Sequence, residues 1–120
     1  MKIVVKEVGK CAEVKEVEKL ELSDMQRLVG GFIQPVYMDD IIIWCNDEGK
    51  LYGLGVNIVL ADKELSKAYD TLNGNIFFTN EEEGSEGLSE QQVQLILEKV
   101  NNGAFTFTQD HQMIPVLGIY

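Results

Sequence analysis

The sequence predicts an α+β fold: a mainly antiparallel sheet with two to three helices packed on it, in a single compact domain. Three observations lead to this prediction. The chain has 120 residues, the usual size of one domain. Short β-like stretches cluster around a few helical segments without a regular β-α-β alternation, which favours α+β over α/β. No stretch between them is long enough to act as a linker between two domains.

The first 30 residues predict a hairpin followed by a helix. Residues 3–8 and 12–17 flank the turn at Gly9 and Lys10, an arrangement typical of a β-hairpin. Residues 23–26 have the capping-box pattern, so we expect Ser23 to begin a helix. Gly30 ends it, because glycine adopts the left-handed conformation of a helix terminus without a steric penalty.

The next stretch predicts two strands. Residues 31–37 contain Pro35, which places their strand at a sheet edge or a bulge. Asp39 and Asp40 form a turn into residues 41–45, which are apolar on both faces. This run is therefore predicted as a central strand.

The second half of the chain predicts two helices and three strands. A helix is expected from Val56 or Asp62 to Leu72, because its apolar residues have helical spacing. A second capping box begins at Ser89, and the apolar stripe after it predicts the clearest helix in the chain. The remaining segments are predicted as strands at 75–79, 104–108 and 113–120, and as an acidic, solvated loop at 80–87.

The charge of the chain disfavours direct binding of nucleic acid. There are 20 acidic and 10 basic side chains, a formal net charge of −10, and Arg27 is the single arginine. Residues 1–20 sum to +1 and the rest to −11, so no cluster of Lys and Arg is available to neutralise phosphates. The acidity serves either solubility or contact with a basic protein surface.

The sequence also predicts a soluble protein of the cytoplasm. The longest uninterrupted apolar run, residues 41–45, is far shorter than the ~20 residues that span a bilayer. Residues 1–7 are charged too early for a signal peptide. The two cysteines are too few for a disulfide scaffold.

The residues available for catalysis are few. His111 is the only histidine and lies in a polar turn, and Cys11 and Cys45 have the pattern of ordinary free cysteines. Structural zinc requires about four clustered Cys or His ligands, more than the three that the chain contains. We therefore predict no catalytic residue, no metal site and no cofactor.

A set of polar and aromatic residues near the middle of the chain forms the candidate ligand site. Asn46, Lys50 and Asn57 bracket the exit of the predicted central strand, where loop side chains converge on ligands. Arg27, Lys50 and the two Asn amides would meet phosphate or ribose. Tyr52 or Trp44 would stack on a base. Ordinary turn chemistry explains most of these residues equally well. The full set is Arg27, Trp44, Asn46, Lys50, Tyr52 and Asn57.

Two segments carry a resemblance to a known family. Residues 28–33, with Gly30 and Gly31, and residues 45–54, with Asn57, resemble the domain-of-unknown-function family 3846. Residues 73–78 and 88–93 fit it as well. Val8 and Gly55 stand where the family pattern has proline. The resemblance defines a family-like core at 1–103 and a C-terminal strand or hairpin extension at 104–120.

The family is associated with bacteriophages, plasmids and related bacteria and has no assigned activity. The resemblance therefore implies a small, non-enzymatic accessory protein of a phage or other mobile element, active in the host cytoplasm. By analogy, we expect it to act in counter-defence by sequestering a nucleotide-derived signalling molecule. The alternative is an acidic inhibitor or nucleic-acid mimic that caps a basic surface of a host protein. Exposed strand edges predict a homo-oligomer in either case.

Overall fold

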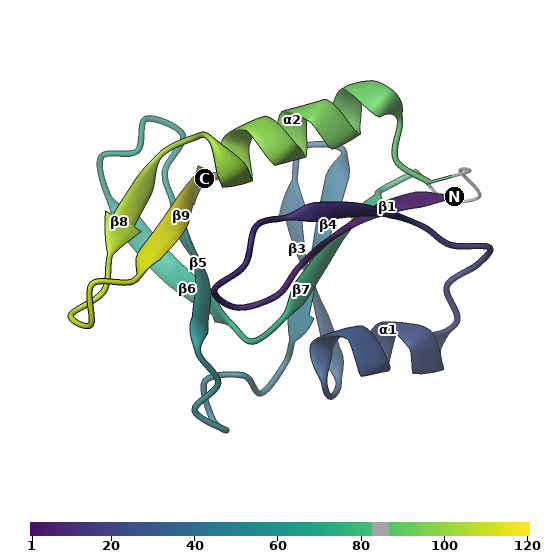
Figure 1. The fold of residues 1–120 in the computed structure, drawn as a ribbon, viewed down its shortest axis with the longest axis horizontal. Helices are drawn as coiled ribbons and strands as arrows, with labels where there is room; N and C mark the ends of the chain where they lie inside the picture. The colour runs from purple at the N-terminus through teal and green to yellow at the C-terminus, as the bar shows by residue number, and fades with distance from the viewer. Residues whose placement is uncertain (83–86) are drawn as a thin grey trace.

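The computed structural model describes residues 1–82 and 87–120, which form two sheets and two helices (Figure 1). The larger sheet is entirely antiparallel and has the strand order β2-β1-β7-β4-β3. Its strands are β1 (Lys2–Lys6), β2 (Glu13–Glu16), β3 (Ile33–Met38), β4 (Ile41–Asn46) and β7 (Ile76–Asn80).

The smaller sheet has the order β6-β5-β9-β8, and only its β5–β9 pair is parallel. Its strands are β5 (Val56–Ala61), β6 (Ala68–Asn73), β8 (Phe105–Phe107) and β9 (Met113–Gly118), and the helices are α1 (Leu22–Val29) and α2 (Glu90–Asn101). The α+β class and the mostly antiparallel pairing are confirmed. The expectation of one sheet is wrong, because the strands divide into two.

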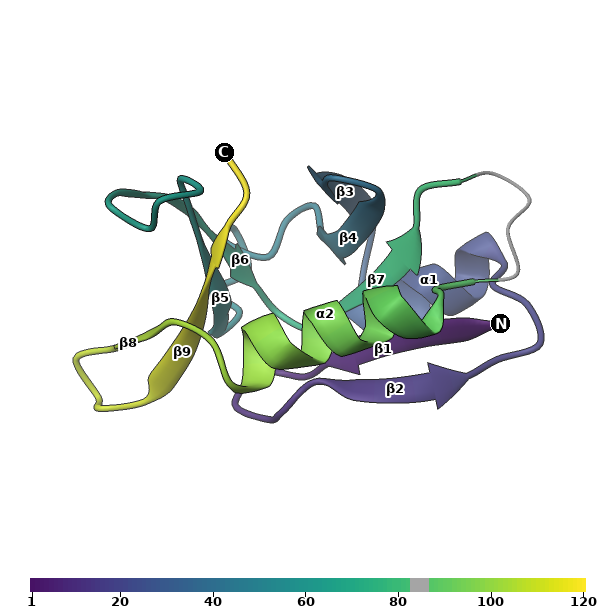
Figure 2. The same cartoon turned by 90° about the horizontal axis from the view of Figure 1, so that it is seen from above.

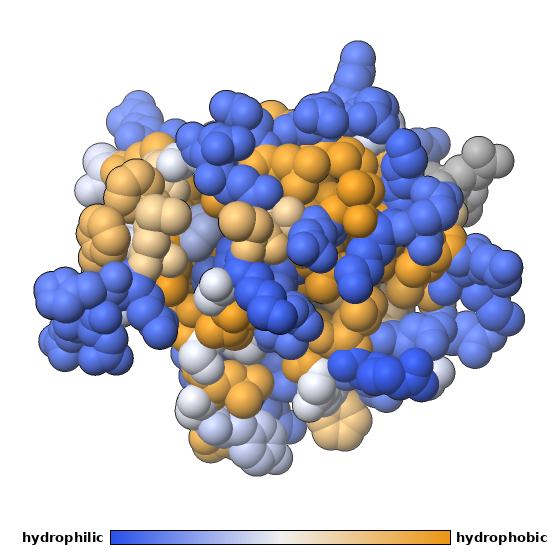
Figure 3. All heavy atoms as spheres, viewed as in Figure 1, coloured by the Kyte–Doolittle hydropathy of each residue, from blue (hydrophilic) through white to orange (hydrophobic). Residues whose placement is uncertain are grey.

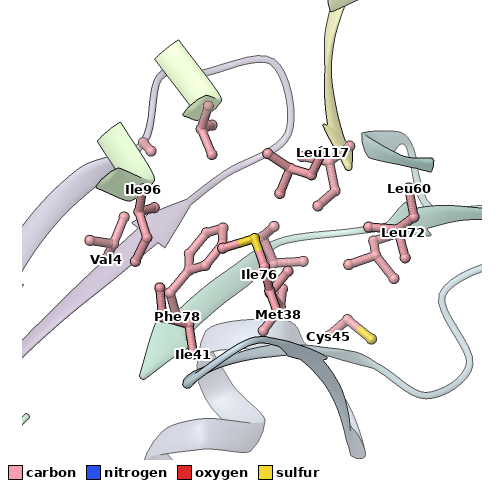
Figure 4. Close-up of a cluster of buried hydrophobic side chains, with 14 of the residues drawn as sticks. Val4, Met38, Ile41, Cys45, Leu60, Leu72, Ile76, Phe78, Ile96 and Leu117 are labelled. Carbon is pink, nitrogen blue, oxygen red and sulfur yellow. The ribbon is translucent and has the colours of Figure 1, made fainter. Parts of the chain in front are cut away.

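The central strands β1, β7 and β4 of the five-stranded sheet are covered on both faces, which explains their continuous apolar runs, whereas the edge strand β2 is exposed. Ile3, Val5 and Phe77 pack with Val29 of α1 on one face. The neighbouring positions along the same strands point to the opposite face, where the larger core lies between this sheet, α2 and the smaller sheet (Figures 2 and 4). Figure 4 labels ten residues of that core, which are Val4, Met38, Ile41, Cys45, Leu60, Leu72, Ile76, Phe78, Ile96 and Leu117.

The predicted helix between Val56 or Asp62 and Leu72 is wrong, because this segment forms β5, a turn and β6. Ile58 and Leu60 are buried at strand spacing, whereas Leu65 and Tyr69 of the expected helical stripe are exposed. The Asp62 carboxylate accepts hydrogen bonds from the backbone N–H groups of Ser66 and Lys67, both at 2.8 Å, and so closes the turn.

The start of α1 also differs from the prediction. Glu21, not Ser23, is the N-cap residue, and the Glu21 backbone N–H donates to the Asp24 carboxylate at 3.0 Å. Ser23 therefore lies inside the helix. The C-terminal prediction is confirmed, since Gly30 has the left-handed conformation with φ 78°. The capping box of α2 is also confirmed, with reciprocal bonds between Ser89 and Gln92 at 2.8 and 3.1 Å.

The remaining predicted strands are present. β1 and β2 form the expected hairpin, β4 lies inside its sheet, and β3 with Pro35 is an edge strand. β8 and β9 form a C-terminal hairpin, and β9 lies between β5 and β8 with Ile114 and Leu117 buried. The acidic loop predicted at 80–87 lies in part, at 83–86, outside the described residues. Neither described helix is long and apolar enough to cross a membrane.

Candidate functional site

The two segments that carry the family resemblance meet in space. The first is the end of α1 with Gly30, Gly31 and Phe32, and the second is the turn that follows β4. The Asn46 side-chain amide donates to the carbonyl of Val29 at 3.1 Å, and the Asp47 N–H donates to the carbonyl of Phe32 at 2.8 Å. The carbonyl of Asn46's side chain accepts from the backbone of the turn as well. The helix end and the turn are thus held together as one unit.

Two glycines make this contact sterically feasible. A Cβ at Gly31 would lie 2.9 Å from Nδ2 of Asn46, so a larger residue would push the amide away from the helix end. A Cβ at Gly49 would overlap the backbone carbonyl oxygen of Asn73 at the end of β6. Gly49 therefore allows the turn to lie directly against the smaller sheet.

The helix end and the turn enclose a hollow of about 330 Å³, which we call the aromatic hollow. The side chains of Phe32 and Tyr52 are 65% and 69% exposed at this hollow, although both are large and partly or wholly apolar. The Gln26 side chain is half-buried at this hollow and makes no hydrogen bond to the described part of the chain. The hollow is lined by Gln26, Gly30, Gly31, Phe32, Asn46, Glu48 and Tyr52.

The electrostatics of the aromatic hollow favour neutral or positively charged groups. The C-terminal end of α1, which carries the negative end of the helix dipole, lies at Gly30. The half-buried Glu48 adds a carboxylate, and the seven lining residues include no Lys or Arg. Arg27 is in the last turn of α1, exposed and 3.5 Å from the Asp24 carboxylate.

A second hollow of about 230 Å³ lies along the same turn and includes Asn46, Lys50 and part of β6 in its lining. Lys50 forms an ion pair here with Asp70, and this hydrogen bond lowers the pKa of Asp70 below its ordinary value. Cys45 also lines this hollow, and burial raises the pKa of its thiol to about 11. The thiolate, which is the nucleophilic form, is therefore disfavoured at neutral pH.

The six predicted ligand residues do not form one cluster. Asn46 lines both hollows, Tyr52 lines the aromatic hollow and Lys50 lines the second. Arg27 is in the helix that contributes the aromatic hollow's wall but is not among the lining residues.

The last two predicted residues are engaged inside the fold. Trp44 packs on Phe77, and its indole N–H donates to the hydroxyl of Thr79 at 2.9 Å. Asn57 is fully buried, and its amide bonds to Lys6 and to the carbonyl of Gly74. Neither residue lines either of the two hollows.

Sequence reasoning missed Phe32, Gln26 and Glu48. The expected strand at residues 31–37 includes Phe32, whereas β3 begins at Ile33 and leaves this ring outside the sheet. The sequence does contain an indication of this, because Phe32 directly follows Gly30 and Gly31, and two glycines disfavour a strand at that point. The catalytic candidates are dispersed: His111 is exposed in the β8–β9 turn and Cys11 is exposed after the first hairpin turn.

Within residues 1–82 and 87–120, no group of three or more His, Cys, Asp or Glu side chains is placed to hold a metal ion.

The chain belongs to the family described as Domain of unknown function (DUF3846), whose model matches residues 1–101. The match covers both segments that form the aromatic hollow and ends at the last residue of α2. The comparisons with curated proteins and with solved structures found no match.

Proposed function

We propose that this protein is a non-enzymatic binding protein that holds a nucleotide-derived molecule by its base in the aromatic hollow. The observation that carries the proposal is the convergence of the two family segments on one hollow with two exposed aromatic rings. Its volume, about 330 Å³, is at the lower end of the ~300–1,000 Å³ typical of ligand pockets. A planar base rather than a bulky ligand fits this size.

The lining supplies the contacts that a base requires. Phe32 and Tyr52 offer stacking surfaces, and base–aromatic stacking is worth about 1–3 kcal/mol per base. The side-chain amide of Gln26 offers a donor and an acceptor to the polar edge of the base. Glu48 accepts hydrogen bonds from an exocyclic amino group, which favours adenine-like or guanine-like rings over pyrimidinediones.

The same electrostatics orient the ligand. Glu48 and the carboxyl end of α1 oppose a phosphate inside the hollow, so the phosphates extend outward. In this arrangement Arg27, exposed in the last turn of α1, exchanges its 3.5 Å contact with Asp24 for a contact with the phosphates. Lys50 remains paired with Asp70 and contributes no contact to the base.

Calorimetric titration of the full chain tests the proposal, with AMP, cyclic mononucleotides, cyclic dinucleotides and ADP-ribose as probes. Phe32→Ala and Tyr52→Ala are each expected to weaken binding about 5- to 150-fold, the equivalent of one lost stacking contact. Tyr37→Ala is the matched control, because Tyr37 is an exposed aromatic residue of β3 outside the hollow. Equal losses in all three variants, or no binding of any probe, would overturn the proposal.

We also propose, from the family resemblance, that binding lowers the free concentration of a signalling nucleotide in the cytoplasm of a phage-infected or plasmid-bearing cell. A binder of this kind must return its ligand unchanged. Chromatography of each probe after prolonged incubation checks this, and a product whose formation is abolished by a single substitution would show an enzyme instead. Burial raises the pKa of the Cys45 thiol to about 11, which disfavours Cys45 as a catalytic nucleophile and so supports the non-enzymatic proposal.

A second candidate function is an acidic inhibitor that caps a basic protein surface. The observation in its favour is a group of exposed carboxylates, Asp39, Asp40, Glu81 and Glu82, at the β3–β4 turn and the end of β7. Lys63 is the one cation paired with this group in the described residues, at 3.5 Å from Asp39. Capping would weaken steeply as ionic strength rises, whereas base stacking in the aromatic hollow would change little.

A further inference from the structure

The C-terminal hairpin is almost free of charge in an otherwise strongly acidic chain. Residues 100–120 contain Asp110 as their only Asp, Glu, Lys or Arg, while the chain as a whole has a net charge of −10. These residues include β8 and β9, and they lie almost entirely beyond the family match, which ends at residue 101. The hairpin is therefore a distinct surface, and its properties follow from residues that the family pattern does not specify.

The outer edge of β8 presents free backbone hydrogen-bonding groups. The strand is at the end of the order β6-β5-β9-β8, and its inner side pairs with β9. The Val116 N–H donates to Ala104, and the Thr108 N–H donates to Gln112, both at 2.9 Å. Because the bonded positions alternate along an antiparallel pair, Phe105 and Phe107 direct their N–H and C=O groups away from β9.

The side chains beside this edge form an exposed apolar face. Phe105, Phe107 and Met113 are 54%, 60% and 56% exposed, and the two rings contact each other edge to face with centroids 5.5 Å apart. Phe107 and Met113 are register partners, so their side chains are on the same face of the hairpin. Figure 3 shows hydrophobic side chains gathered over β8 and β9, with the polar turn of the hairpin at one end.

We propose that β8 pairs with β8 of a second copy of this chain across a two-fold axis, which joins the two smaller sheets into one. An antiparallel pair centred on Thr106 places Phe105 opposite Phe107 of the other copy. Each such pair exchanges two N–H···O=C bonds, so the edge groups of both strands are satisfied. The phenylalanine rings and Met113 of the two copies then cover one another on one face.

Charge identifies the second copy as the occupant. Two chains of net charge −10 repel each other, and the hairpin, whose one Asp, Glu, Lys or Arg residue is Asp110, is the surface on which they approach with the least repulsion. A basic partner would instead be attracted to the acidic surfaces elsewhere. The inference is independent of the proposed function, because β8 and α1, which forms a wall of the aromatic hollow, lie at opposite ends of the molecule (Figures 1 and 2).

Sedimentation equilibrium over a range of protein concentrations tests the proposal. The wild-type chain is expected to reach twice the 13.5 kDa of one copy as concentration rises. A Phe105→Glu/Phe107→Glu variant should remain monomeric over the same range. Phe107→Pro removes one outward N–H without breaking a bond to β9, and it should weaken the dimer at least about tenfold, the equivalent of 1.4 kcal/mol. Tyr37→Glu, on the β3 edge of the other sheet, should dimerise like the wild type.

Circular dichroism confirms that each variant is folded before its mass is interpreted. The dimer is also expected to tighten as salt is added, because screening reduces the repulsion between the two acidic copies. A wild-type chain that stays monomeric, a double-glutamate variant that dimerises normally, or a Tyr37→Glu variant that becomes monomeric would each overturn the proposal. Weaker association at high salt would do the same.

Discussion

Replacing Asn57 by alanine is expected to lower the free energy of unfolding by about 3–5 kcal/mol, a large part of the ~5–15 kcal/mol typical of a domain. Asn57 is fully buried in β5, and its Oδ1 accepts from the ammonium group of Lys6 at 2.6 Å. Its Nδ2 donates to the carbonyls of Lys6 and Gly74, both at 2.9 Å. One side chain therefore ties the larger sheet to the smaller one.

The magnitude follows from what the substitution leaves behind. Lys6 is 3% exposed, and its remaining acceptor is the carbonyl of Glu7 at 3.4 Å. A hydrogen bond to a charged group is worth about 1.5–3 kcal/mol, and each neutral one adds about 0.5–1.5 kcal/mol. Asn75→Ala is the matched control, since Asn75 accepts a single hydrogen bond, from the Val8 N–H at 3.0 Å. This variant should lower the free energy of unfolding by about 1 kcal/mol.

Urea unfolding, followed by the fluorescence of the one tryptophan, measures both variants. The double variant Lys6→Met/Asn57→Leu removes the charge together with its partner, so it should be more stable than Asn57→Ala despite the extra substitution. A loss of unfolding free energy in Asn57→Ala no larger than that in Asn75→Ala would show that the buried Asn57–Lys6 hydrogen bonds do not stabilise the fold as proposed. The same conclusion would follow if the double variant lost as much unfolding free energy as the single variants Lys6→Met and Asn57→Leu lose together.

The buried Lys6 should also make the free energy of unfolding depend on pH. Burial lowers the pKa of Lys6 in the folded chain from its ordinary 10.5. Between the folded and unfolded pKa values the unfolded chain binds more protons, so this group's contribution to stability rises as pH increases toward 10.5. Lys6→Met lacks the titrating group. The stability difference between wild type and Lys6→Met, measured by urea unfolding, should therefore shift in favour of the wild type as pH rises, and a shift in the other direction contradicts the assignment.

Three further predictions test local features. Ser89→Ala removes the N-cap of α2 and should lower the free energy of unfolding, measured in urea, by about 1 kcal/mol. Ser23→Ala, inside α1, should lower it by less than half of that. Gly49→Ala places a Cβ against a backbone carbonyl; we expect a loss of about 1–3 kcal/mol, and an unchanged melting temperature would exclude the close packing of that turn. An aromatic disulfide reagent at mildly alkaline pH should modify Cys11 quickly and Cys45 only after unfolding, and equal rates would contradict the burial of Cys45.

Local patterns predicted those elements whose signals are local. The first hairpin, the end of α1 at Gly30 and the capping box at Ser89 depend on neighbouring residues, and the structure confirms them. The helix prediction for residues 56–72 is wrong because its four residues at helical spacing, Leu65, Ala68, Tyr69 and Leu72, are also compatible with two strands joined by a turn. Tertiary packing decides between a helix and two strands here. Ile58 and Leu60 pack in the core beneath a second sheet, which the sequence alone does not reveal.

The candidate site shows the same division. Tyr52 and Asn46 were identified because they follow a recognisable buried strand, and both line the aromatic hollow. Asn57 carries the same kind of polar signal, but its amide is used between the sheets. Whether a polar residue near a strand end faces a hollow or a neighbouring strand depends on the packing of distant segments. Phe32 is missing from the predicted site because the expected strand at residues 31–37 includes it, whereas β3 begins at Ile33.

In our proposal, the end of α1 and the turn after β4 form one binding surface for a base. An NMR titration of the ¹⁵N-labelled chain with the tightest-binding nucleotide of the panel maps that surface residue by residue. We expect amide shift changes concentrated at Gly30, Gly31, Phe32, Glu48 and Tyr52, with the ligand recovered intact. Saturable binding whose shift changes lie elsewhere, such as at the acidic β3–β4 turn, would contradict it.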